Sequence, residues 1–174
     1  GLQDFNELKE LLLEQNQSFE SISKKDDPQE RINEYHQLVR DSIDEVIHSI
    51  DLKQIHKLCK DMKKYDQIAA FGLLKAEGPA ISLQADLLMQ GKQIYTNISY
   101  QEQMDYILNA SEDTLIIIFS YTGAYFDYPS LRANAKKLER PQIYMISARE
   151  IETPKYINET ILFHSNHDQG SHPY

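Results

Sequence analysis

The sequence predicts an α/β fold: a three-layer, doubly wound parallel sheet of about five strands with a helical N-terminal lead-in. Three observations predict this class. The N-terminal part of the chain spaces its apolar residues at helical intervals. Residues 114–119 (TLIIIF) form an uninterrupted apolar run, as expected of a central strand buried on both faces. Shorter apolar runs then alternate with helical segments, which favours β-α-β units.

The lead-in is expected to contain three helices. The first occupies residues 5–19. The second begins at Asp27, an N-cap followed by proline at the first helical position, and carries an apolar stripe from Ile32 to Ile50. The third begins at Asp51, and five of its side chains are expected to face inward: Leu52, Ile55, Leu58, Cys59 and Met62. These helices pack either on the core or on a partner subunit.

Strand and helix signals alternate after the lead-in. Five strands are predicted, at residues 67–72, 93–97, 114–119, 142–147 and 159–164. Helices are predicted between them at residues 78–91, 99–109 and 129–138, the second starting at a Ser99–Glu102 capping box. We therefore divide the chain into a helical lead-in, residues 1–65, and an α/β domain, residues 66–174. A further helix is expected after the last strand, which suggests a truncated chain.

The composition argues against several functions. The formal net charge is −9, so the chain repels a polyanion and is not expected to bind DNA itself. No apolar run is long enough to cross a bilayer, and the single cysteine, Cys59, is typical of a reducing, cytoplasmic compartment. Three histidines and an aspartate gather near the C-terminus: His164, His167, Asp168 and His172. They have no fixed helical register, so no metal or cofactor is expected there.

The best candidate for a binding site follows the strand at residues 114–119. In an open parallel sheet, ligands bind where the carboxyl ends of strands meet the next segments. Ser120 and Thr122 place two hydroxyls at i and i+2, and Gly123 lets the backbone turn close to a bound group. With the amides at the start of the next helix, these hydroxyls suit a phosphate dianion. Alternatively, Ser120 and Thr122 merely cap that helix.

The same residues carry a family resemblance. The run from Asp113 to Gly123, DTLIIIFSYTG, resembles the strand and the Ser-x-Ser-Gly-x-Thr loop of sugar isomerase (SIS) domains, which bind phosphosugars. Residues 68–92 and 135–147 are similar to the neighbouring strands and helices of that family. Residues 1–9 and the lead-in resemble the end of the helix-turn-helix domain and the linker of RpiR-type transcriptional regulators. The resemblance implies a ligand that is a sugar phosphate or a related small anion.

The resemblance also implies the residues of the site and shows where the chain departs from the family. The implied ligand-binding residues are Ser120, Tyr121, Thr122, Gly123 and Tyr125, together with Lys75. Where the family has Gly-x-Gly-x-Ser, this chain has Leu74 and Ala76 after Gly72, so one serine contact is missing. Tyr125 replaces a threonine; its phenol can donate, but its ring crowds a small phosphate. Lys75 either supplies a compensating charge or is an ordinary exposed lysine.

The leading hypothesis is the effector-sensing and dimerisation domain of a bacterial RpiR-type regulator, which would contact DNA only through a domain absent from this chain. A homodimer is expected because the lead-in carries more apolar face than the core needs. No catalytic residue is assigned and the chain is not expected to be an enzyme, although Glu150 and Glu152 follow a strand end where an isomerase would keep its base. The alternatives are a degenerate SIS domain that only dimerises and a sugar-phosphate isomerase-like enzyme.

Overall fold

The computed structural model describes residues 27–127, 133–150 and 152–164, which belong to two compact units. Helix α2 (Pro28–Ser49) lies almost wholly in the first unit, and residues Ser49–Phe163 form the second. The helix predicted at residues 5–19 lies outside the described residues. None of the described helices is long and apolar enough to span a membrane.

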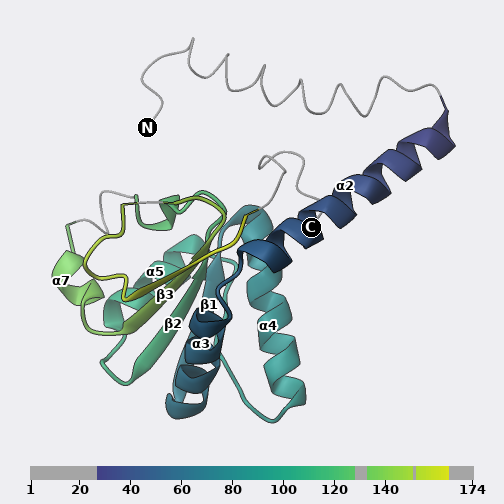
Figure 1. Ribbon diagram of the computed structural model, residues 1–174. Coiled ribbons are helices and arrows are strands. Elements are labelled where there is room, and N and C mark those ends of the chain that lie inside the picture. The colour runs from purple at the N-terminus through teal and green to yellow at the C-terminus, as the bar shows by residue number, and fades with distance from the viewer. Residues whose placement is uncertain (1–26, 128–132, 151, 165–174) are drawn as a thin grey trace. The chain divides into compact units, whose positions relative to one another are not determined.

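The second unit is built on a parallel sheet of four strands in the order β1-β2-β3-β4 (Figure 1). The strands are β1 (Gln67–Gly72), β2 (Thr114–Phe119), β3 (Gln142–Ser147) and β4 (Glu159–Leu162). In the register, Gly72 lies opposite Phe119, so β1 and β2 end side by side. The loops that follow these two strands therefore leave the same edge of the sheet.

The strand predicted at residues 93–97 is reduced to a single bridge between Tyr95 and Ala69. Tyr95 donates its amide to the Ile68 carbonyl at 2.8 Å, and its carbonyl accepts from the Ala70 amide at 2.9 Å. The chain then leaves the sheet because the Asn97 side chain accepts from the Ser99 amide at 2.7 Å and starts the next helix. The expected sheet of about five strands is therefore four strands and one bridge.

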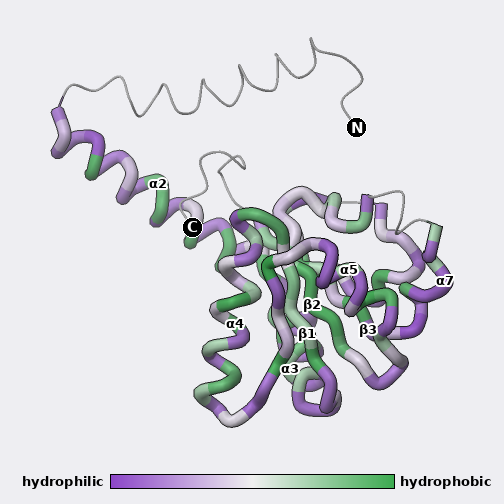
Figure 2. Tube along the Cα trace, turned by 180° about the vertical axis from the view of Figure 1, so that it is seen from behind, coloured by the Kyte–Doolittle hydropathy of each residue, from purple (hydrophilic) through white to green (hydrophobic). Residues whose placement is uncertain are grey.

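Helices cover both faces of the sheet, which confirms the predicted three-layer, doubly wound architecture (Figure 1). On one face, α3 (Leu52–Lys64) and α4 (Glu77–Met89) pack through Leu58 and Ala80 against alternate strand residues such as Ile117. On the other face, α5 (Tyr100–Asn109) and the short helix α7 (Ala135–Leu138) pack through Ile107 and Leu138. Figure 2 shows how strongly apolar residues concentrate in the strands between these layers.

The predicted helix starts are confirmed at their caps. Asp27 accepts from the Gln29 amide at 2.9 Å, and Asp51 accepts from the Lys53 amide at 2.8 Å. Ser99 accepts from the Glu102 amide at 3.4 Å, but the Glu102 carboxylate pairs with the Asn97 side chain instead of completing the capping box. The helix predicted at residues 129–138 is described only from Ala135 to Leu138, because residues 128–132 lie outside the described part.

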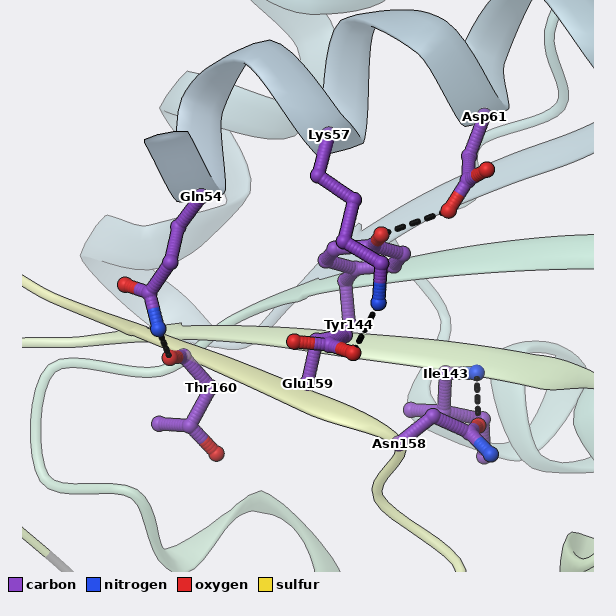
Figure 3. Close-up of polar contacts among 8 residues, drawn as sticks. All are labelled: Gln54, Lys57, Asp61, Ile143, Tyr144, Asn158, Glu159 and Thr160. Atoms are coloured by element: carbon purple, nitrogen blue, oxygen red, sulfur yellow. Dashed lines mark hydrogen bonds and ion pairs between the residues drawn. The ribbon is translucent and has the colours of Figure 1, made fainter. Parts of the chain in front are cut away.

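Helix α3 is attached to the sheet by its polar side chains (Figure 3). Asp61 accepts from the Tyr144 hydroxyl on β3 at 2.6 Å, Gln54 donates to the Thr160 carbonyl on β4 at 3.0 Å, and Lys57 pairs with Glu159. These contacts place the polar side of α3 against strands β3 and β4. Two side chains expected to face inward, Leu52 and Cys59, are exposed as a result.

Candidate functional site

The candidate site lies at the carboxyl edge of β1 and β2. At this point the connections of the chain lead to opposite sides of β1. The chain leaves β1, pairs at Tyr95 on the outer side of β1, and then returns to form β2 on the inner side. Such a switch point is where open α/β sheets bind ligands, because the two flanking loops separate toward opposite faces. The loop that follows β2, residues 120–123, and the loop that follows β1, residues 73–76, therefore border the site.

The loop at residues 120–123 is anchored to the neighbouring strand β3. The Ser120 amide donates to the Ile146 carbonyl at 3.0 Å, and the Tyr121 carbonyl accepts from the Ala148 amide at 3.2 Å. A turn closes when the Gly123 amide donates to the Ser120 carbonyl at 3.1 Å. Gly123 has φ = 76°, a left-handed conformation that favours glycine. The sequence motif thus produces a tight loop of fixed shape.

The two hydroxyls of this loop have different surroundings. Thr122 accepts from the Ala124 amide at 3.3 Å, so it caps the following turn as the second interpretation expected. Ser120 is 9% exposed, and its hydroxyl makes no hydrogen bond within residues 27–127, 133–150 and 152–164. The hydroxyl oxygen itself is not fully enclosed by the described residues, so water or a ligand atom can reach it and accept its proton. Ser120 is therefore the group in this loop best suited to contact a ligand.

The segment that follows Gly123 differs from the expected helix. It is a single 3-10 turn at Ala124–Phe126. The helix predicted at residues 129–138 begins outside the described residues, so the amides of its N-terminus stay a prediction. Within the described residues, the groups that can contact an anion are the Ser120 hydroxyl and the amides of the loop itself.

Tyr125 lies beneath the loop and not at its mouth. Its side chain is 3% exposed, and its hydroxyl donates to the Oε1 atom of Gln103 at 2.6 Å. Burial, with a smaller contribution from Tyr100, raises the pKa of the Tyr125 phenol far above its ordinary value. The phenol is therefore neutral, and its proton is already donated within the protein. Ligand contact by Tyr125 stays a prediction, and this geometry leaves its oxygen only as an acceptor.

The loop after β1 keeps the backbone of a glycine motif without all of its glycines. A Cβ atom at Gly72 would lie 2.1 Å from the Ala76 carbonyl oxygen, so this position requires glycine. Leu74, at the second glycine position of the family motif, has φ = 56° and is 82% exposed. It is the only residue other than glycine with a positive φ in the described part of the chain. The loop thus contains a backbone conformation that favours glycine, and a strained leucine occupies it.

The charged side chains at this edge are few and exposed. Lys75 lies in the 3-10 turn Leu74–Ala76, exposed, on the other side of the switch point from Ser120. Arg149, which the sequence analysis did not consider, follows β3 in a turn where the Ser147 hydroxyl accepts from its amide at 3.1 Å. Glu150 is exposed in the same segment. No group of three metal-ligating side chains occurs in the described residues, and His167, Asp168 and His172 lie outside them.

Gln103 is the site residue that the sequence analysis missed. It is fully buried on α5, and its Nε2 atom donates to the Gly72 carbonyl at 3.0 Å and to the Asn97 carbonyl at 2.6 Å, while its Oε1 accepts from Tyr125. Glutamine is ordinary on the exposed face of a helix, so composition did not single it out. The only signal in the sequence was its position directly before Met104, where the buried face of the predicted helix begins.

No protein-family model matches the sequence, and no curated protein matches it either. Solved structures do match, 19 chains in all. NanR of Vibrio vulnificus, solved in complex with ManNAc-6P, has a TM-score of 0.65 and 13% identity over 83% of this chain and 53% of NanR. This chain therefore spans about half of the NanR chain.

Two further structures show the same similarity. The sugar isomerase domain of an RpiR transcription factor from Sphaerobacter thermophilus has a TM-score of 0.59 and 12% identity over 74% of each chain. A protein from Listeria monocytogenes assigned as a sugar-phosphate isomerase has a TM-score of 0.66 and 10% identity over 86% of this chain and 81% of its own. The chain therefore has the fold of the SIS domain, which confirms the resemblance at the level of the fold.

Proposed function

We propose that this chain is the effector-sensing and dimerisation domain of an RpiR-type transcriptional regulator, and that it binds a phosphorylated sugar or a related small anion at the Ser120 loop. One structural neighbour is the sugar isomerase domain of an RpiR transcription factor, and another, NanR, was solved with ManNAc-6P. The regulator's DNA-binding domain would be a separate part of the protein. A cytoplasmic location follows from this role.

The observation that carries the proposal is the Ser120 hydroxyl. It makes no hydrogen bond within the described residues, can be reached from solvent, and lies at the switch point of the sheet. A phosphate oxygen would accept its proton in a charge-assisted hydrogen bond. The exposed cations Lys75 and Arg149 border the same edge and can partly balance the charge of the anion.

A thermal-shift screen of the purified chain tests this proposal. The panel contains N-acetylmannosamine 6-phosphate, fructose 6-phosphate, glucose 6-phosphate and inorganic phosphate. A ligand that binds only the native state at 100 times its Kd stabilises it by about 2.7 kcal/mol, which is measured as a rise in Tm. We expect a rise for at least one sugar phosphate and its loss in Ser120→Ala. Ser82→Ala, an exposed serine of α4, is the matched control.

We also propose that the chain is not an enzyme. An isomerase needs a base held within hydrogen-bond reach of a bound sugar. The candidate bases, Glu150 and Glu152, are both exposed, and neither makes a recorded hydrogen bond within the described residues. The proposal predicts no interconversion of fructose 6-phosphate and glucose 6-phosphate by the purified chain. Turnover that is lost in Glu150→Gln would instead support the isomerase alternative.

A further inference from the structure

We infer that Gln103 is the residue that positions the candidate ligand loop, by joining it to the loop after β1 and to the segment at Asn97. The inference rests on the proposed function for its ligand. The hydrogen bonds by which Gln103 joins these segments exist in the protein alone and can be tested without a ligand.

Three separate segments of the chain meet at the Gln103 side chain. The Gln103 amide contacts Gly72 at the end of β1, Asn97 before α5, and Tyr125 after β2. These three contacts lie at sequence separations of 31, 6 and 22 residues. No other side chain recorded at this edge of the described sheet connects three segments that distant in the sequence. Gln103 therefore fixes the spacing of all three loops at once.

Each hydrogen bond of the Gln103 side-chain amide has a donor and an acceptor that its partners determine. Two of the three partners are backbone carbonyls, which only accept, so they require the two N–H groups of the Gln103 amide. The amide oxygen is then left for the third partner, and the Tyr125 hydroxyl must donate to it. Rotating the amide by half a turn would set its oxygen against two carbonyl oxygens. The orientation of the side chain is therefore determined by its partners.

Burial isolates the hydrogen bond between Gln103 and Tyr125 from water. Gln103 is fully buried and Tyr125 is 3% exposed, so water does not replace a hydrogen bond that is lost between them. Tyr125 lies two residues from Gly123, whose left-handed backbone closes the loop that carries Ser120. The direction in which the Ser120 hydroxyl is presented thus depends on a hydrogen bond made beneath it. In this inference Gln103 is a positioning residue that acts through Tyr125 and the loop.

Hydrogen exchange of backbone amides, measured on the full chain by mass spectrometry, tests the inference. In Tyr125→Phe, the loss of one hydrogen bond should speed exchange in residues 120–127 by about two- to tenfold. Tyr106→Phe is the matched control, because it removes a hydroxyl that makes no recorded hydrogen bond from the same core cluster. In Gln103→Leu, exchange should become faster in residues 73–76, 97–99 and 120–127 together.

The result that would overturn the inference is equally specific. Wild-type exchange rates in residues 120–127 of Tyr125→Phe would show that the hydrogen bond to Gln103 does not hold the loop. An equal acceleration in α3 and β3 would show a general loss of stability, with no positioning role. If Gln103→Leu does not fold, the Tyr125→Phe and Tyr106→Phe pair decides the question alone.

A ligand measurement separates this inference from the proposed function. Fructose 6-phosphate and inorganic phosphate are titrated into the wild type, Tyr125→Phe and Tyr106→Phe. We expect Tyr125→Phe alone to weaken the binding of whichever probe the wild type binds, by about two- to tenfold. If neither probe binds the wild type, the proposed ligand class is contradicted while the exchange experiment still decides the role of Gln103. If both tyrosine variants bind like the wild type, the positioning role is contradicted.

Discussion

At the scale of single residues, Leu74 occupies a backbone conformation that favours glycine. Its φ of 56° is the left-handed conformation, which costs about 1–2 kcal/mol for a residue with a Cβ atom. The side chain is 82% exposed, so packing does not repay this cost. The family motif indicated that a glycine is missing at this position, but only the structure showed that the backbone of Leu74 is strained.

Leu74→Gly is therefore expected to stabilise the protein. Removal of the strain, about 1–2 kcal/mol, is offset in part by the greater freedom that glycine gives the unfolded chain, which costs about 0.4–1 kcal/mol, so the net gain is up to about 1.6 kcal/mol. Lys60→Gly, at an exposed position inside α3, is the control and should destabilise by about 0.5–1 kcal/mol. Urea denaturation followed by circular dichroism measures both changes. Equal losses in the two variants would contradict the strain at Leu74.

Two buried tyrosines predict how stability depends on alkaline pH. Burial raises the pKa of Tyr125, and burial together with the hydrogen bond to Asp61 raises the pKa of Tyr144. In the unfolded chain both phenols ionise near pH 10, while in the folded chain they stay protonated. The stability from these groups is thus complete below about pH 10 and falls as the pH rises above it, by about 1.4 kcal/mol per pH unit for each tyrosine.

Urea unfolding at several pH values between about 9 and 12 measures this slope. Tyr125→Phe and Tyr144→Phe should each reduce the slope above pH 10 by about one proton. A slope that is the same in the wild type and in both variants would show that these phenols ionise alike in the folded and unfolded states.

At the scale of elements, local pattern predicted the strands well and the contacts between elements poorly. The strands at residues 67–72, 114–119 and 142–147 have the bounds that their apolar runs indicated. Residues 93–97 have a similar pattern but form one bridge, because the hydrogen bonds of Asn97 turn the chain into α5. Gln103 was missed for a related reason: its three partners lie on other segments, and no local pattern records them.

Helix α3 illustrates the same limit of local pattern, since its polar flank decides which side faces the sheet. The hydrogen bond from Tyr144 to the Asp61 carboxylate is 2.6 Å long and partly buried, and such bonds to charged groups contribute about 1.5–3 kcal/mol. Lys57 and Glu159 form an ion pair with side chains 50% and 27% exposed, which contributes no more than about 1 kcal/mol.

Tyr144→Phe is therefore expected to destabilise the protein more than Lys57→Ala. The predicted losses are about 1.5–3 kcal/mol for the first and about 1 kcal/mol or less for the second. The chain has no tryptophan, so unfolding in urea is best followed by circular dichroism. The opposite order would mean that the ion pair, and not the buried hydrogen bond, attaches α3 to the sheet.

At the scale of the whole molecule, the outer face of α4 supports the proposed dimer. One side of this helix packs on the sheet through Ala80, yet its other side exposes Ile81, Leu88 and Met89 by 45%, 56% and 88%. A helix that is apolar on both sides is typical of a buried element, and an exposed apolar face commonly marks a partner surface. A second copy of the chain would cover it.

Leu88→Lys is expected to shift a dimer toward the monomer, because it brings a charge into the apolar face. Gln101→Lys adds the same charge at an exposed polar position of α5, on the opposite side of the sheet, and should leave the dimer intact. Light scattering at micromolar concentration measures the mass of each variant. A monomeric wild type, or a dimer that survives Leu88→Lys unchanged, would contradict a dimer formed through α4.

The central claim is that the Ser120 loop binds a phosphorylated sugar, and titration calorimetry on the purified chain tests it most directly. N-acetylmannosamine 6-phosphate and fructose 6-phosphate are titrated into the wild type, Ser120→Ala and the Ser82→Ala control. We predict saturable binding of at least one sugar phosphate to the wild type and the control, and binding weakened by about tenfold or more in Ser120→Ala, as expected for the loss of a charge-assisted hydrogen bond. No binding to a folded wild type, or equal binding to all three proteins, would contradict the claim.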